Sequence, residues 1–412
     1  MINPDELLLL LAAILLLGFV GEIGFRKKRI PDMLLLLLVG VIIHYTGLVP
    51  SAYLALMRSL LGFVGTFALI FIVFGGVIRL DLKKFGKSLS RGTALASADL
   101  IFVMTMLTAI LYYALKLSLV DSILLSAILS ESSVTFIMPL ISRIKLNEAI
   151  AHIVEVETIM NSVMNIIVVL LILSIMNQQV SVIGLTSYLF GTISEALVLG
   201  GVIGIIWLII LRQALTPHYY IATIAMLFVL WGVSDYLGAS AILTVFIFSV
   251  IIANSGPLSR IVRISGTIDT DSLTYFNQEI TFFVMTLFYV YIGILVNIFD
   301  FRGLLIAAFL VVALVAIRVV EVYSVQGVTK WFGSDSRIVS SFVQRGSTVI
   351  VLSGILLSVD PSAFSLFGNI LFYVVILSIL TGSVLFSVTS KRYSSISSGK
   401  VVISHEGDQP GK

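Results

Sequence analysis

Seven ionisable residues stand inside long apolar runs of this sequence, and they are its strongest candidates for chemistry. A charged side chain at membrane depth costs several kcal/mol unless it is paired or hydrated, so such residues typically mark the pathway of an ion or a proton. The chemistry that they indicate is the binding and release of small ions. The seven residues are Asp99, Glu131, Glu155, Glu157, Arg318, Glu321 and Arg345.

Two of these residues lie in stretches that are poor helix formers. Glu131 stands among serines and β-branched residues at positions 130–135, with Pro139 after them, and Arg345 stands in the run Gln-Arg-Gly-Ser-Thr at 344–348. Each stretch predicts a broken helix. Two interrupted helices, one in each half of a chain, are typical of transporters built from an inverted repeat with the binding site near the bilayer midplane. The alternative interpretation is that the hydroxyls only bond their own helix backbone.

A third polar cluster follows the first break. Glu157, Asn161 and Asn165 are four residues apart and share one helix face, while Glu155 and Ser162 share a neighbouring face. A helix with two such faces is unsuited to contact with lipid. We expect it to face a cavity or the two broken helices.

The elements that position these residues are membrane spans. The chain has 412 residues, of which 59% are hydrophobic and 11% charged, and its mean hydropathy is +1.13. This composition predicts an all-α integral membrane protein that forms a single membrane domain over 1–412, with a short tail at 391–412. Apolar runs between charged or Pro/Gly/Asn-rich breaks predict thirteen spans, at 5–25, 32–49, 56–78, 92–115, 120–142, 148–176, 184–211, 217–236, 239–254, 278–298, 303–326, 337–358 and 363–390.

The distribution of basic residues predicts the orientation of these spans. With the N-terminus outside, 20 of the 25 lysines and arginines fall in inward-facing segments and three fall in outward loops. Because the positive-inside rule depends on the parity of the loops, a missed or extra helix would scramble this bias. The prediction is an external N-terminus and a cytoplasmic C-terminus. The same topology accounts for the basic pI, so no nucleic-acid partner is expected.

Other classes of function find little support in the residues. The chain has no cysteine, and its four histidines are scattered, so we expect neither a cofactor nor a resident metal site. An intramembrane enzyme would need paired aspartates or a histidine placed with a carboxylate, and neither Asp-Asp nor Gly-x-Gly-Asp occurs. The chain is therefore expected not to be an enzyme. A channel or uncoupled conductor remains an alternative, because it would share the charges that line the pathway.

The sequence resembles the monovalent cation:proton antiporter superfamily, in particular prokaryotic and archaeal sodium/proton antiporters of the thirteen-helix type. Those proteins carry Thr-Asp-Pro in broken helix 5 and Glu-Ser-x-x-Asn-Asp in helix 6. The stretch from Ser132 to Asn165 fits this spacing without a gap, and the run that begins at Glu157 falls on the helix 6 motif. Gln344-Arg345-Gly346 is similar to the Pro-Arg-Gly of helix 12, and Arg318 to the arginine of Ala-Arg-Pro in helix 11.

The resemblance implies a fold and an activity. It implies an inverted-repeat fold with broken helices 5 and 12 that cross, and exchange of a monovalent cation, Na⁺ before Li⁺ or K⁺, for protons by alternating access. A core of 92–176 and 303–390 would move against a scaffold of 1–80 and 217–298, which would form a homodimer. The expected location is the plasma membrane of a prokaryote. In relatives the counterparts of Glu157 and Arg345 form a structural ion pair, and Asp99 with Arg318 is a second candidate pair.

The departures from the family pattern lie at the ion site. The aspartate of helix 6 is Ser162 here, the aspartate of Thr-Asp-Pro is Ser133, and the glutamate of Phe-Glu-Gly-Gly in helix 3 is Phe74. A hydroxyl can donate a ligand oxygen to a cation but does not titrate near pH 7. The candidate ion and proton ligands that remain are Glu131, Ser132, Ser133, Thr158, Asn161 and Ser162, with Glu155 as a secondary candidate.

Three hypotheses stay open for Glu131. It is a relocated titratable ligand that reaches the cavity beside Ser162, a structural or gate-lining residue of an exchanger with altered ion choice, or a residue of a relative that has lost proton coupling.

The predicted orientation can be tested directly, because single cysteines can be introduced without a native background. Cysteines in the loop 83–91 and in the tail after Lys391 should react only with reagents that reach the cytoplasm, and cysteines at 48–53 should react from outside. External labelling at Lys87→Cys would contradict the thirteen-span topology.

Overall fold

The computed structural model describes residues 4–28, 32–47, 51–78, 86–142, 144, 146–178, 182–213, 218–256, 270–359 and 361–405. Regular structure in these ranges is entirely helical. Nine of the basic residues that were assigned to inward segments lie outside the described residues. These are Arg29, Arg79, Lys83, Lys84, Arg143, Lys145, Arg260, Arg263 and Lys412.

The helices follow the predicted spans closely. The first half of the chain contains α1 (Pro4–Lys28), α2 (Asp32–Tyr45), α3 (Ser51–Val77), α5 (Lys87–Tyr113), α6 (Leu119–Leu129), α7 (Val134–Ile141), α8 (Glu148–Gln178) and α9 (Val182–Gln213). The second half contains α10 (Tyr219–Leu237), α11 (Ala241–Ala253), α13 (Thr270–Leu295), α14 (Phe301–Thr329), α15 (Ser336–Val339), α16 (Ser347–Val359) and α17 (Pro361–His405).

The chain has the helices of a multi-pass membrane protein. Within the described residues, seven helices are long and apolar enough to cross a bilayer, and six shorter apolar helices accompany them. Many large apolar side chains on the outer faces are exposed, as expected of helices that face lipid. The predicted class, an all-α membrane protein, is confirmed, and the count of thirteen spans stays a prediction.

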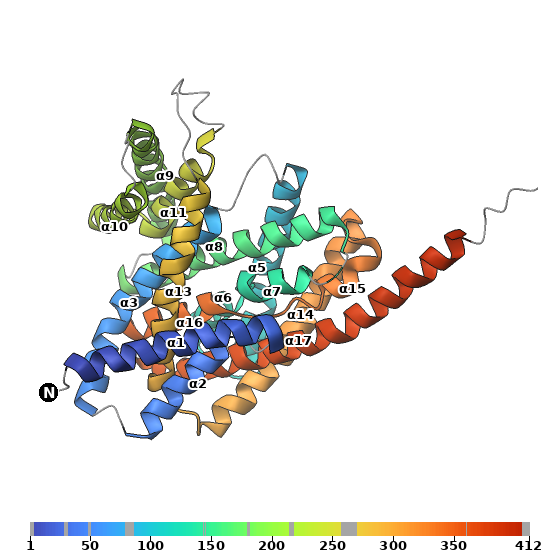
Figure 1. Cartoon of the computed structure of the whole chain (residues 1–412), viewed down its shortest axis with the longest axis horizontal. Helices are drawn as coiled ribbons and strands as arrows, with labels where there is room; N and C mark the ends of the chain where they lie inside the picture. The colour runs from blue at the N-terminus through green and yellow to red at the C-terminus, as the bar shows by residue number, and fades with distance from the viewer. Residues whose placement is uncertain are drawn as a thin grey trace, which may run out of the picture.

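Both predicted helix breaks are confirmed. The fifth span is divided into α6 and α7 by the non-helical residues 130–133. The twelfth is divided into α15 and α16, with non-helical residues at 342–346. The two breaks lie against each other, because the Ser133 N–H donates to the Gln344 carbonyl at 3.1 Å. In Figure 1, α6, α7 and α16 lie toward the middle of the molecule.

Two helix boundaries differ from the prediction. α13 begins at Thr270, eight residues before the predicted span, because the polar residues ahead of residue 278 are helical; one of them, Asn277, belongs to the wall of a cavity. α17 continues to His405, well beyond the predicted end of the span at residue 390. A change from apolar to polar residues marks where a span leaves the apolar layer, and a helix can continue past that point. α17 is the long helix that projects from the body in Figure 1.

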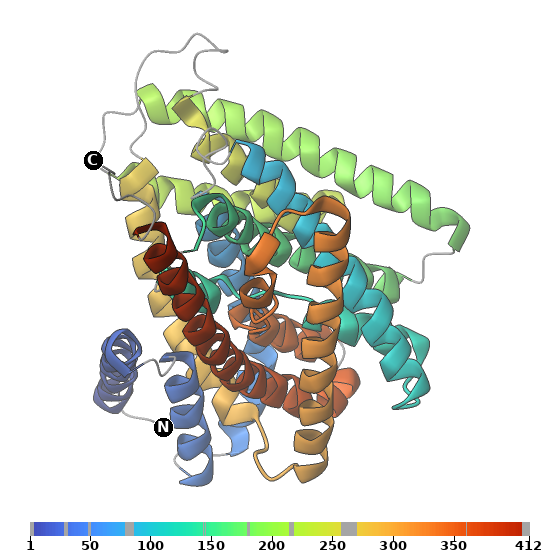
Figure 2. The same cartoon turned by 90° about the vertical axis from the view of Figure 1, so that its right-hand side faces the viewer.

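The helices form two groups that meet around the breaks. In the first group, α13 packs against α2 and α3, and α11 packs against α3. α9 and α10 both pack against α11. α5 packs against α6, α8 and α14, and α14 packs along α17, which Figure 2 shows side by side. α16 contacts α3 on one side and α17 on the other, and therefore joins the two groups.

α2 and α13 approach each other closely through two glycines. A Cβ atom on Gly40 would overlap the Val290 carbonyl oxygen, and one on Gly293 would overlap the Leu37 carbonyl oxygen. Small residues at such crossings let helix backbones pack without a hydrophobic driving force from water.

We expect Gly293→Val to force α2 and α13 apart, because the new side chain meets backbone atoms that cannot move aside. The loss should be about 1–3 kcal/mol, the usual cost of overpacking, and should appear as a lower melting temperature in detergent. Gly232→Val in α10 is the matched control, since a Cβ there meets nothing within 4 Å. Equal losses in the two variants would contradict the packing argument.

Candidate functional site

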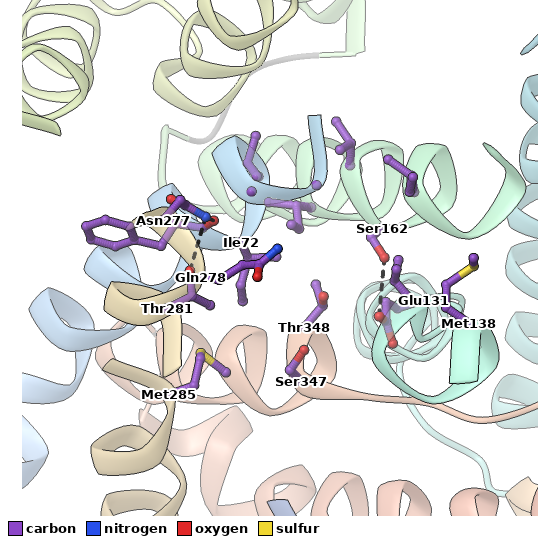
Figure 3. A pocket seen from close by; sticks show the side chains of 18 of the residues that line it. Ile72, Glu131, Met138, Ser162, Asn277, Gln278, Thr281, Met285, Ser347 and Thr348 are labelled. Carbon is purple, nitrogen blue, oxygen red and sulfur yellow. Dashed lines mark hydrogen bonds between the residues drawn. The ribbon is translucent and has the colours of Figure 1, made fainter. Parts of the chain in front are cut away.

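A cavity of about 350 Å³ lies between the two groups of helices. One wall comes from α3 and α13, and the other from the first break, α7, α8 and the start of α16 (Figure 3). Among the candidate residues from the sequence, Glu131, Glu155 and Ser162 line it. The other polar lining residues are Asn277, Gln278, Thr281, Ser347 and Thr348.

Glu131 lies in the first break and its carboxyl is held in a fixed orientation. Its Oε2 accepts a hydrogen bond from the Gly346 N–H at 2.9 Å, and its Oε1 accepts one from the Ser162 hydroxyl at 3.3 Å. The Thr348 hydroxyl lies within hydrogen-bonding reach of the same carboxyl. Because Gly346 immediately precedes α16, the carboxylate also lies at the positive end of that helix dipole. One oxygen is thus anchored by the backbone and the other faces Ser162 (Figure 3).

Ser162 has two alternative acceptors. Its hydroxyl lies 3.3 Å from Glu131 Oε1 and 3.2 Å from the Ser132 carbonyl oxygen. A serine hydroxyl carries one hydrogen, so it donates to one of the two at a time. When it donates to the Ser132 carbonyl, its lone pairs and Glu131 Oε1 are both free to face a cation.

Four other predicted ligands do not line the cavity. The Ser132 N–H donates to Asn161 Oδ1 at 2.7 Å, and the Ser133 side chain packs against Gly346, where a Cβ atom would overlap its hydroxyl. The Thr158 hydroxyl bonds the Glu155 carbonyl of its own helix at 2.9 Å. Among these side chains, Asn161 holds the unwound segment in shape, because few other groups can satisfy free backbone N–H and C=O groups at membrane depth.

The predicted partner of Glu157 was wrong. Glu157 Oε1 lies 2.6 Å from Arg318 Nη1, whereas no ion pair joins Glu157 to Arg345 among the described residues. Arg345 instead donates to the carbonyl oxygens of Ser130, at 3.4 Å, and Glu131. The physical reason is that the end of α6 leaves carbonyls without helical partners, and the crossing break places the Arg345 guanidinium beside them.

Arg318 is the centre of a buried cluster. Besides Glu157, its Nη1 lies 3.5 Å from Asp99 Oδ1, the second pair expected from the sequence, and 2.9 Å from Glu321 Oε2. The sequence singled out Glu321 as a buried charge and gave it no role. Its spacing of three residues from Arg318 on one helix was the available signal.

The cavity wall formed by α3 and α13 was missed by the sequence analysis. Asn277 donates to the Phe71 carbonyl at 3.4 Å and to the Thr281 hydroxyl at 3.2 Å. Its amide fits against Gly75, where a Cβ would overlap it. The neighbouring Phe74 is 1% exposed and does not line the cavity, so the position where relatives carry a glutamate supplies no oxygen here.

The site and fold together define a class. Two carboxyl groups, several hydroxyls and amides, and two crossing broken helices around a cavity are the features of a secondary transporter for a small cation. Residues 9–391 match the family model described as sodium/hydrogen exchanger, transmembrane. The chain belongs to the sodium/hydrogen exchanger family.

The solved structures that the chain resembles agree in fold. A structure of the sodium proton antiporter MjNhaP1 from Methanocaldococcus jannaschii at pH 8 matches with a TM-score of 0.76 at 21% sequence identity, over 92% of this chain and 96% of that one. A second structure of MjNhaP1, from an electron-microscopy map, matches with a TM-score of 0.70 at 19% identity, over 100% of both chains. The inverted-repeat antiporter fold expected from the resemblance is confirmed.

The observed pairing predicts a double-mutant cycle. Arg318→Met leaves three buried carboxyl groups without this guanidinium and should cost about 3–5 kcal/mol. Glu157→Gln removes the shortest contact to Arg318 but leaves Asp99 and Glu321 beside it, so it should cost less. Removing both should cost less than the sum of the two losses, measured as the apparent free energy of unfolding in detergent. The cycle of Glu157→Gln with Arg345→Met is the comparison, and its coupling energy should be smaller. A larger coupling to Arg345 would contradict the pairing.

Proposed function

We propose that this protein exchanges a monovalent cation for protons by alternating access, with Glu131 as the titratable ligand. The single observation that carries the proposal is the contact between Glu131 Oε1 and the Ser162 hydroxyl at 3.3 Å in the wall of the cavity. Ser162 occupies the position of the family's ion-binding aspartate, so Glu131 brings a carboxylate back to the same place from the neighbouring break.

Coupling follows from competition for one carboxylate. Glu131 is 1% exposed, and an ionised carboxylate that is removed from water is costly unless a positive charge accompanies it. It can take a proton or a cation, and binding of one displaces the other. An antiporter requires only that the cavity opens to each side of the membrane in turn while Glu131 carries either a proton or a cation.

The ligand set suits a small hard cation. Carboxylate and hydroxyl oxygens are the ligands that such ions prefer, and Glu131, Ser162, Ser347 and Thr348 present them from two crossing segments. We propose Na⁺ as the substrate, with Li⁺ and K⁺ as alternatives. Binding is expected to use one Glu131 oxygen, because the Gly346 N–H holds the other.

The position of the cavity supports the proposed division of the chain. Its walls come from α3 and α13 of the scaffold regions 1–80 and 217–298, and from α7, α8 and α16 of the core regions 92–176 and 303–390. Sliding of the core against the scaffold would then carry Glu131 from one side to the other. We further propose that the scaffold forms a homodimer in a prokaryotic plasma membrane, with the N-terminus outside.

A second candidate is an uncoupled or divergent cation channel or transporter. The observation that favours it is the presence of Ser162, a hydroxyl that does not titrate, where the family has a carboxylate. In that case Glu131 serves to hold the break through Gly346, and cation flux is independent of the pH gradient.

We expect Glu131→Gln to abolish cation flux driven by a pH gradient in proteoliposomes while the protein still folds. The amide keeps one oxygen for the Gly346 N–H but can neither ionise nor release a proton. Ser162→Ala removes one neutral oxygen and should only weaken cation binding. Glu155→Gln is the matched control, since Glu155 is half-buried in the same cavity wall and is expected to retain flux.

Ser162→Asp separates the two candidates. It places a second carboxylate beside Glu131, and two like charges in one site hold a proton more readily than one, so the pH range of an active exchanger should move upward. Undiminished pH-driven flux in Glu131→Gln would refute the role of Glu131. A silent wild type with robust flux in Ser162→Asp would instead identify the uncoupled relative.

A further inference from the structure

Behind the cavity lies a second group of carboxyls that takes no part in the proposed exchange. Asp99 of α5, Glu157 of α8 and Glu321 of α14 surround Arg318, and the four side chains are between 0% and 2% exposed. None of them lines the cavity. Water and substrate cations therefore have no open route to them in this conformation.

One nitrogen of Arg318 cannot serve all three acids. Its Nη1 lies 2.6 Å from Glu157, 2.9 Å from Glu321 and 3.5 Å from Asp99, yet a guanidinium Nη carries two hydrogens. Asp99 Oδ1, Glu321 Oε1 and both Glu157 carboxyl oxygens accept no hydrogen bond from any described residue, and Arg318 Nε and Nη2 donate none. The Asp99 and Glu321 carboxyl groups contact the same Arg318 nitrogen and therefore lie close to each other.

The charges around the cluster do not balance. The second guanidinium that faces it is Arg345, from the break before α16, 3.9 Å from Asp99 Oδ2. Among the described residues, three carboxylates thus face two guanidiniums, which leaves one negative charge in excess. Glu131, which faces Arg345 from the first break, only adds to the excess. An uncompensated charge inside protein is so costly that the group takes up a proton instead.

We propose that Asp99 and Glu321 share one resident proton, in a hydrogen bond between Asp99 Oδ1 and Glu321 Oε1. The pair is a proton-binding site separate from Glu131. Glu157 is the poorer carrier, because it makes the shortest contact to Arg318 and protonation would weaken that contact. The charge count holds whether or not Glu131 is the exchange site, so this inference does not rest on the proposed function.

A chain of hydrogen bonds connects the acid pair to the cavity. Asn161 Nδ2 donates to Asp99 Oδ2 at 3.0 Å, and Asn161 Oδ1 accepts from the Ser132 N–H at 2.7 Å. The Ser132 carbonyl in turn accepts from Ser162, the neighbour of Glu131. An amide side chain does not pass protons readily, but it transmits a change of charge on Asp99 to the shape of the break.

Infrared spectroscopy of the reconstituted protein tests the proposal. At pH 8 with saturating NaCl, the wild type should show the carbonyl stretch of a protonated carboxyl group. Glu321→Gln and Asp99→Asn should each lose the intensity of one such group, because either change makes the cluster neutral without a proton. Glu155→Gln should retain it. A band that persists in both Glu321→Gln and Asp99→Asn overturns the proposal. The proposed exchange site is followed separately, in the difference spectrum between the wild type and Glu131→Gln.

Thermal stability places the proton on this pair. The amide that Glu321→Gln introduces can donate to Asp99 as the shared proton does, so this variant should melt close to the wild type, whereas Glu157→Gln should melt lower. Equal losses in Glu321→Gln and Glu157→Gln would overturn the assignment. The proposal would also be overturned if Na⁺ raised the melting temperature of the wild type and of Glu131→Gln but not that of Glu321→Gln. A cation, and not a proton, would then occupy the pair of Asp99 and Glu321.

Discussion

The crossing of two unwound helices is the constraint on which the rest of the structure depends. Each break leaves backbone N–H and C=O groups at membrane depth, where lipid offers them no partner. The structure satisfies them with side chains drawn from distant segments. Arg345 donates to the carbonyls of Ser130 and Glu131, Asn161 accepts from the Ser132 N–H, and Glu131 accepts from the Gly346 N–H. The polar residues of the core therefore serve first to stabilise the breaks, and the ion site is built from what these bonds leave free.

The same requirement explains how the proposed cation site can form without the family's aspartate. Ser162 still closes the break by donating to the Ser132 carbonyl, a bond that a carboxylate could not make, and the carboxylate reappears at Glu131 on the segment that the bond holds. A titratable group can move between neighbouring positions because the cavity is small and both segments face it. The hydrogen bonds made by Asn161 and Arg345 cannot move in this way, since each of these side chains replaces backbone partners that the helices lack.

How far the sequence could predict this structure depends on the kind of information that each residue carries. The breaks at 130–133 and 342–346 were predictable, because helix propensity is local and both stretches violate it. The proximity of Glu131 and Ser162 followed from the register of two adjacent segments. The partner of Glu157 was not predictable, because spacing along a helix defines a face but not which of two arginines on other helices lies nearer. Asn277 and Gln278 were missed for a different reason: polar residues at the edge of a span are equally typical of a loop and of a helix that lines a cavity.

The balance of charge links the buried cluster to the proposed cation site at Glu131. Arg318 and Arg345 neutralise two of the four carboxylates in the core formed by Asp99, Glu131, Glu157 and Glu321. Of the remaining two negative charges, the one at Glu131 borders a cavity and can be met by an ion that comes and goes. The other negative charge belongs to the buried cluster, which does not line the cavity. Only a species that needs no hydration can neutralise it there, and a proton is the smallest such species. A fixed proton in the cluster then keeps Arg345 free to hold the break, whereas without it the excess charge on Asp99 would draw the Arg345 guanidinium away from the carbonyls that depend on it.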